Sequence, residues 1–250
     1  MQSLQVNHSD SLLGRVKEHF QSTGVYARRR QPVYEEQEKI ILPFIRQTVS
    51  PGSRILEIGG GSGYFLDSIA RSCGNRNLVN LEIVPHVYRE QVNQNTLLVG
   101  GAAQRLPFTK ESFDHVVAVN LLHHLVSMRR NSSKNQCSRA IGEMLRVTKK
   151  KGHILILERC NRHRFFSAVI FYATFLLALS KLNLSFMGVG KGVIVSFLTP
   201  YEIHETMTEG NRVKICCERT SPQKVSFRKK ATLLMSQEDI CVLIGRKKES

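Results

Sequence analysis

The segment 55–63, which reads Ile-Leu-Glu-Ile-Gly-Gly-Gly-Ser-Gly, joins a short apolar run to a stretch with helical periodicity. Glycine allows a sharp turn and lets a ligand approach the main chain without a Cβ in the way. A strand that enters a helix through such a loop is typical of a βαβ unit. The segment therefore predicts an α/β fold with a parallel sheet, whose first strand ends at a ligand-binding loop.

Short apolar runs alternate with helical stretches along the rest of the chain, which extends the same pattern. Strands are predicted at 54–58, 78–83, 96–99, 113–119 and 154–158, with weaker ones near 212–219 and 239–246. Helices are predicted at 64–72, 84–93 and 138–147, and a tight turn at 149–152. The elements are those of a doubly wound sheet with helices on both faces.

The charge balance is strongly basic, because 36 Lys and Arg face 20 Asp and Glu, for a formal net charge of +16. A field of this sign attracts phosphates, anionic lipid surfaces or acidic substrates. The N-terminal residues lack the basic start and apolar run of a secretory signal, so we expect a cytoplasmic protein. The six cysteines show neither a CxxC pair nor a metal-ligand spacing, which favours free thiols and predicts no metal site.

Two carboxylates accompany the glycine loop. Glu57 ends the first predicted strand, and Glu82 lies 25 residues later at the end of the second. A carboxylate at the second strand's tip can accept hydrogen bonds from ribose hydroxyls. A nicotinamide dinucleotide site has similar components, but its GxGxxG fingerprint, counted from Gly59, requires glycine where Tyr64 stands. The pattern favours a nucleoside site of another kind.

Seven pieces of the chain occur in the order and spacing of a known family: 55–65, 81–84, 101–108, 112–117, 120–125, 141–147 and 152–158. Over roughly residues 54–158 the chain resembles class I methyltransferases of the ubiquinone/menaquinone-biosynthesis type. The resemblance implies a Rossmann-like, doubly wound, seven-stranded, mostly parallel sheet with an antiparallel last strand. We expect residues 1–50 to form a helical cap and residues 51–250 the methyltransferase domain, with a lid or insertion at about 160–195.

The resemblance also implies a cofactor, S-adenosylmethionine, bound over the strand tips. The residues expected to bind it are Glu57, Gly59, Gly60, Gly61, Gly63, Glu82, Ile83, Ala102, Ala103 and Asn120. One position departs from the family, which usually carries an acid where Ala102 stands and uses it to bond the adenine amino group. Losing such a hydrogen bond weakens recognition by about 1 kcal/mol. The departure leaves open a protein that binds S-adenosylmethionine without catalysis.

Candidate catalytic residues follow the fourth and fifth predicted strands. His123 and His124 come after the fourth, and Glu158 ends the fifth on the same side of the sheet. The sulfonium methyl of the donor is already activated, so a base is needed only to take a proton from a hydroxyl or an acidic carbon. Histidine suits that task near neutral pH. The alternative is that the two histidines pack against or cap the next helix.

The uncharged segment 165–180 predicts a helix that is apolar almost all round. It is shorter than the roughly 18 residues of a membrane span, so a buried, interfacial or lid helix is expected. Because this superfamily builds its substrate lid after the fifth strand, the segment favours a small hydrophobic acceptor, lipid-like or quinone-like. Arg162, Arg164 and Lys181 flank it and could hold it peripherally on an anionic membrane surface.

RNA is the second acceptor that the sequence leaves open. The net charge suits phosphate binding, and residues 123–130 resemble the corresponding stretch of tRNA wobble-uridine methyltransferases. Against RNA, an apolar helix is a poor surface for phosphates, and no separate RNA-binding module is recognisable. The hydrophobic acceptor is therefore the preferred prediction.

Overall fold

The computed structural model describes residues 32–74, 77–84, 95–180, 194–223 and 238–249. The strands in these ranges are β1 (Ile55–Ile58), β2 (Leu78–Glu82), β3 (Leu97–Gly100), β4 (Phe113–Val119), β5 (Thr148–Cys160), β6 (Val213–Gln223) and β7 (Glu238–Lys247). The helices are α2 (Pro32–Thr48), α3 (Tyr64–Cys73), α4 (Arg130–Val147), α5 (Arg164–Ser180) and α6 (Pro200–Thr208). Two 3₁₀ turns, η2 (Leu122–His124) and η4 (Glu209–Asn211), complete the described elements.

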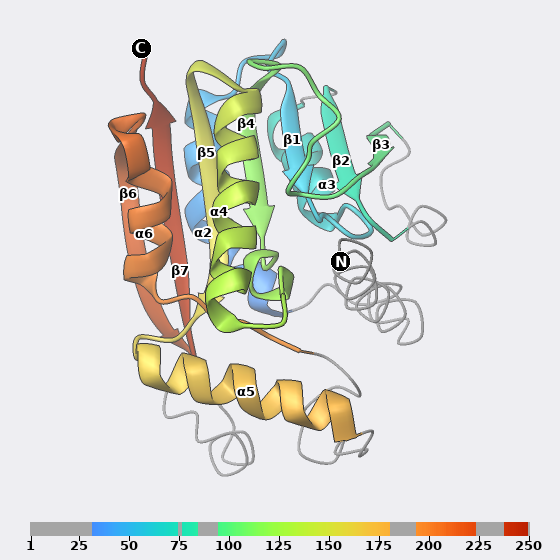
Figure 1. The fold of residues 1–250 in the computed structure, drawn as a ribbon. Helices are drawn as coiled ribbons and strands as arrows, with labels where there is room; N and C mark the ends of the chain where they lie inside the picture. The colour runs from blue at the N-terminus through green and yellow to red at the C-terminus, as the bar shows by residue number, and fades with distance from the viewer. Residues whose placement is uncertain (1–31, 75–76, 85–94, 181–193, 224–237, 250) are drawn as a thin grey trace.

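The seven strands form one sheet in the order β3-β2-β1-β4-β5-β7-β6 (Figure 1). Within the set of strands β1 to β5, every pair of adjacent strands is parallel. Strand β7 is antiparallel to both β5 and β6. The predicted fold class, a mostly parallel doubly wound sheet with an antiparallel last strand, is confirmed.

The central strands are apolar on both faces, as expected of parallel strands covered on both sides. Ile55 and Leu155 face a cluster that includes side chains of α2 and α3. Their sequence neighbours, Leu56 and Ile154, face the opposite cluster, which includes side chains of α4 and α6. Successive side chains of a strand point to opposite faces, so the two helical layers enclose the sheet.

Three elements differ in their bounds from the prediction, and one of them, β6, continues to Gln223 past its expected end near residue 219. Helix α4 begins at Arg130 rather than near residue 138, because its polar first turns are held by tertiary contacts and carry no apolar periodicity. Residues 149–152 lie inside β5, where the register with β4 shifts and Lys151 adopts a φ of 62°. The predicted turn is thus an irregularity within a longer strand. The helix predicted at 84–93 lies almost wholly outside the described residues.

Helix α5 lies across the end of the sheet toward which β1 and β4 point (Figure 1). This is the carboxyl end of the parallel strands, where ligands bind in open α/β sheets. Among the helices that the structure describes, none combines the length and the apolar character needed to cross a bilayer.

Candidate functional site

The glycine loop between β1 and α3 has a backbone that only glycine adopts readily. Gly59, Gly61 and Gly63 have φ values of 69°, 54° and 77°, all in the left-handed region. The loop is anchored to the neighbouring strand because the N–H of Gly59 donates to the carbonyl of Leu81 over 2.7 Å. The three alternate glycines of the sequence pattern are therefore required by the chain path itself.

Gly60 is required for a different reason, which is lack of space. A Cβ at this position would lie 2.6 Å from Glu57 Oε2 and 2.6 Å from Asn80 Oδ1. Asn80 is fully buried, and its Nδ2 donates to the carbonyl of Gly61 over 2.9 Å. Sequence reasoning missed Asn80, although an amide in the middle of an apolar strand was a signal that could have revealed it.

Glu57 is 2% exposed, and its Oε2 has no hydrogen-bond partner among the described residues. Burial, and secondarily the nearby carboxylate of Glu82, raise the pKa of Glu57 to about 8, although the N–H of Leu66 opposes the shift. Such a shift at a strand tip is typical of a functional site, because folding alone gains nothing from a buried carboxyl group with one unpaired oxygen.

Glu82 ties the second strand to the glycine loop. Its Oε2 accepts the N–H of Gly61 over 3.1 Å. Its Oε1 accepts the N–H groups of Ile83 and Val84 over 2.7 Å and 3.1 Å. The structure therefore brings together Glu57, Glu82 and Ile83, which the sequence places in two separate segments.

The remaining predicted binding residues lie at the same end of the sheet. The N–H of Gly101 donates to the carbonyl of Glu82, which places Ala102 and the buried Ala103 directly after the tip of β3. Asn120 follows β4 in a left-handed conformation, with a φ of 50°. Its N–H donates to the carbonyl of Leu157, and its Oδ1 is buried without a partner among the described residues.

These residues fit a ligand that donates hydrogen bonds. Glu57 Oε2, Asn80 Oδ1 and Asn120 Oδ1 all lack a hydrogen-bond partner within the part of the chain that the structure describes, and an unpaired buried polar atom is costly. S-adenosylmethionine carries matching donors, namely an ammonium group, ribose hydroxyls and an adenine amine. The glycines of the loop add no Cβ atoms beside these acceptors, so the residues present suit this cofactor.

A second cluster lies where η2 meets the end of β5. His123 Nδ1 and Glu158 Oε1 are 2.5 Å apart, and the two residues are 7% and 1% exposed. Glu158 also accepts the N–H groups of Leu122 and Arg159. If Glu158 is the acceptor, Nδ1 of His123 carries a proton, and in the neutral imidazole the lone pair then stands on Nε2.

The residues that precede α6 lie against this histidine. The ring of Phe197 stacks on that of His123 with centroids 5.4 Å apart, and the N–H of Ser196 donates to the carbonyl of His123. Phe197 also packs with Ile170 of α5. The ring of His124 is tilted against that of His123, with the two centroids 4.0 Å apart. The His123 ring therefore has two ring neighbours, His124 and Phe197, and contacts α5 through Phe197.

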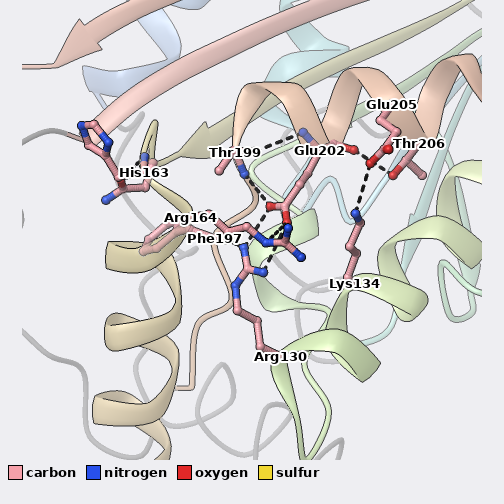
Figure 2. A network of polar contacts seen from close by, with 10 residues as sticks. Arg130, Lys134, His163, Arg164, Phe197, Thr199, Glu202, Glu205 and Thr206 are labelled. Carbon is pink, nitrogen blue, oxygen red and sulfur yellow. Dashed lines mark hydrogen bonds and ion pairs between the residues drawn. The ribbon is translucent and has the colours of Figure 1, made fainter.

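A buried ion pair joins the starts of three helices (Figure 2). Arg130 of α4 donates to both carboxylate oxygens of Glu202 over 3.2 Å and 2.9 Å, and Arg164 of α5 lies 3.5 Å from the same group. Glu202 also forms a capping box with Thr199 at the start of α6. Burial tends to raise the pKa of Glu202, but the hydrogen bonds from Arg130 and the N–H of Thr199 hold it below its usual value. The sequence signal for this helix start was the Thr-Pro-Tyr-Glu motif at 199–202, which the sequence-based prediction did not include.

Comparison with known proteins also indicates a methyltransferase. Residues 56–156 match the family model described as a methyltransferase domain. The ubiquinone/menaquinone biosynthesis C-methyltransferase of Bordetella parapertussis is 36% identical over 121 residues, which are 45% of this chain and 43% of that protein. The probable tRNA methyltransferase 9B of Homo sapiens is 27% identical over 139 residues, 53% of this chain and 28% of that protein. The chain thus spans less than half the length of these relatives.

Solved structures share the fold across nearly the whole chain. The Haloferax volcanii methyltransferase in complex with the Trm112 methyltransferase activator has a TM-score of 0.64 and 12% identity, and the match covers 94% of this chain and 98% of that one. An S-adenosylmethionine-dependent methyltransferase of Methanosarcina mazei has a TM-score of 0.58 and 17% identity, over 83% and 98%. The family match and the strand order agree: the chain contains a class I methyltransferase domain, of the family whose methyl donor is S-adenosylmethionine.

Proposed function

We propose that this protein transfers a methyl group from S-adenosylmethionine to a small hydrophobic acceptor, lipid-like or quinone-like. The observation that carries the proposal is the apolar helix α5 at the carboxyl end of the sheet, in contact through Phe197 with the His123 ring. An apolar wall beside a histidine suits an acceptor with a hydrophobic body and one acidic C–H or O–H group.

Different residues of the chain bind different parts of the methyl donor. Glu57, Asn80 and Asn120 offer the acceptor oxygens, and the glycine loop offers backbone with no Cβ in the way of a ligand. To Glu82 we assign the ribose hydroxyls, because a carboxylate at the tip of the second strand can accept their hydrogen bonds. When bound, S-adenosylmethionine supplies an activated sulfonium methyl group. The residues around it then have to align the acceptor in line with the bond that breaks, and to exclude water.

On the acceptor side we assign His123 as the base. Its Nε2 takes the proton of the acceptor carbon or hydroxyl as the methyl group is transferred. Glu158 is fully buried and accepts three hydrogen bonds, so it acts through His123 as a positioning residue that maintains the Nδ1–H tautomer. His124, beside it, contributes to the shape of the acceptor site.

The test of the acceptor is direct. Purified protein is incubated with methyl-labelled S-adenosylmethionine and, separately, a lipid extract and total RNA. We expect label in the lipid fraction. Label in RNA alone contradicts the proposal, and cofactor binding without label in either extract supports the non-catalytic alternative.

The roles of His123 and Glu158 are tested by substitution. His123→Gln is expected to reduce kcat by about 100-fold or more, the contribution of a general base. Glu158→Gln should also lower kcat and shift its pH profile, because the amide can favour the wrong tautomer. His204 and Glu218 form an exposed pair of the same kind, 2.8 Å apart, so His204→Gln is the matched control and should leave activity unchanged.

Ala102 offers a test by gain of function. Ala102→Asp restores the acid that the family usually carries and should tighten S-adenosylmethionine binding by about fivefold, the value of one hydrogen bond of about 1 kcal/mol. Calorimetric titration of both proteins measures the change. Unchanged affinity means that the adenine is held from elsewhere.

RNA remains the second candidate because of the human relative and the net charge. One observation weighs against it. Arg130, in the stretch that resembles tRNA methyltransferases, is 6% exposed and paired with Glu202, so it does not present its charge to a phosphate.

A further inference from the structure

Helix α5 buries its polar side chains and exposes large apolar ones, which reverses the usual arrangement of a surface helix. Its two hydroxyl side chains are buried, Ser167 at 0% exposed and Thr174 at 3%. Phe165, Tyr172 and Leu176 are exposed at 73%, 50% and 64%. Their spacing of seven and four residues puts all three on one face of the helix. A helix on a protein surface normally turns its polar side outward, so this face is suited to an apolar surrounding.

The orientation is set by specific contacts on the inner side. The Thr174 hydroxyl donates to the carbonyl of Ile170 and accepts the N–H of Val195. Phe171 is fully buried with Ile194, on the same inner side of the helix. The outward direction of the apolar face therefore follows from packing that turns the hydroxyls inward.

The charges beside this face are positive. No Asp or Glu occurs from residue 159 to 180, whereas Arg162 stands just before α5 and Arg164 is its first residue. Arg162 contacts Asp239 and Arg164 contacts Glu202, yet their side chains are still 45% and 70% exposed. Lys181, the third flanking cation noted in the sequence, lies outside the described residues. An apolar face next to exposed arginines complements an anionic lipid surface.

We propose that the face formed by Phe165, Tyr172 and Leu176, the α5 face, docks on an anionic bilayer surface with the helix lying in the interface. A second copy of the chain fits less well. A 17-residue helix is about 25 Å long and offers a strip of roughly 250 Å², while a stable interface takes about 800 Å² from each partner. A bilayer sets no such minimum, since the side chains enter it individually.

This docking places the methyl-transfer site toward the bilayer. The α5 helix lies at the carboxyl end of the parallel strands, the end that holds the glycine loop and His123 (Figure 1). An acceptor dissolved in the membrane would then reach the site from the interface. That consequence rests on the proposed function, whereas the docking itself is measured without any turnover.

The chain contains no tryptophan, which allows a clean experiment. Tyr172→Trp puts a single fluorophore on the α5 face, and Leu97→Trp puts one at a site that is also exposed, at the start of β3, the opposite end of a parallel strand. With vesicles of phosphatidylcholine and phosphatidylglycerol at 3:1, we expect a blue-shifted emission for Tyr172→Trp and none for Leu97→Trp. Vesicles of phosphatidylcholine alone should bind at least tenfold more weakly, because each arginine near an anionic surface contributes about 1 kcal/mol.

A second pair of variants tests the same face by charge. Leu176→Asp should abolish co-sedimentation with the anionic vesicles, whereas Leu97→Asp should leave it unchanged, and circular dichroism confirms that both are folded. Vesicle binding that survives Leu176→Asp overturns the proposal. So does an unshifted Tyr172→Trp emission combined with a dimer in light scattering that Leu176→Asp dissociates. Vesicle binding without methylation of any lipid leaves the docking intact and refutes only the proposed acceptor.

Discussion

At the scale of single residues, Glu57 holds a carboxyl group where the fold disfavours its charge. Its pKa is about 8 in the folded protein against an ordinary value of 4.5. Between these values the folded state binds more protons than the unfolded state, so the contribution of Glu57 to stability falls as the pH rises from 4.5 to 8. Glu57→Gln should therefore be more stable than the wild type at pH 8, by on the order of 4 kcal/mol, with the difference vanishing below pH 4.5.

Urea denaturation at the two pH values measures this effect, and calorimetry should show that the same variant has lost S-adenosylmethionine binding. Glu143 is the control with the opposite sign, because its hydrogen bond from Arg146 lowers its pKa. Glu143→Gln should lose stability above pH 4.5. A Glu57→Gln variant that is less stable at pH 8 and binds the cofactor normally would show that Glu57 is an ordinary structural residue.

Gly60 and Gly142 form a matched pair of glycines that tests the tight packing around Gly60. A Cβ on Gly60 would meet the Glu57 and Asn80 side chains, whereas a Cβ on Gly142, inside α4, would meet nothing within 4 Å. Gly60→Ala should cost about 1–3 kcal/mol of stability and weaken cofactor binding. Gly142→Ala should stabilise by about 0.5–1 kcal/mol, the usual gain from replacing glycine in a helix. Thermal unfolding of both variants checks the contrast, and equal effects would contradict the close approach.

The candidate site was predictable where its geometry is local. The alternate glycines and Glu57 belong to one strand and loop, and the register of adjacent parallel strands brings Glu82 beside them. Asn80 and Arg130 could not be assigned in this way. The partner of Arg130 lies 72 residues away, and although an amide within an apolar strand marks Asn80 as unusual, its contact with Gly60 depends on the coordinates.

At the scale of elements, strands and helices with a strong hydrophobic period were predicted within one or two residues, and α4 and β5 were not. The first turns of α4 are polar and are held by Arg130, and β5 continues through a lysine run that no propensity favours. The position of α5 in the sequence was predicted, but which side of the helix faces the protein was not. A helix that is apolar almost all round has no side that its sequence marks as the buried one.

The junction of α4, α5 and α6 at Glu202 gives an element-scale prediction. Glu202→Gln leaves the Arg130 guanidinium buried without a counter-charge and should destabilise the fold by about 3 kcal/mol or more. Glu205 pairs with Lys134 at the surface, where it is 54% exposed, so Glu205→Gln should cost less than about 1 kcal/mol. Urea denaturation of the two variants at pH 7 measures the difference. Similar losses would mean that the buried pair is replaceable.

At the scale of the whole molecule, the cofactor should stabilise the native state, because only the folded chain assembles the loop with Glu57 and Asn120. At a concentration 100 times its Kd, S-adenosylmethionine adds about 2.7 kcal/mol. For a chain of this length that raises the Tm by roughly 5–10 °C. Differential scanning calorimetry with and without cofactor measures the shift. The Glu57→Gln variant should show little of it, and a full shift in that variant would place the cofactor elsewhere.

Strand β7 lies between β5 and β6, although it is made after both. Translation adds about 5–20 residues per second, and β6 leaves the ribosome before the strand that joins it to the sheet exists. Until β7 is made, β5 and β6 have edges whose hydrogen-bonding groups are unpaired, a condition that invites aggregation. A nascent chain halted before residue 238 therefore leaves β5 and β6 without the strand that pairs with both. Synthesis through residue 247 supplies β7 and completes the seven-stranded sheet.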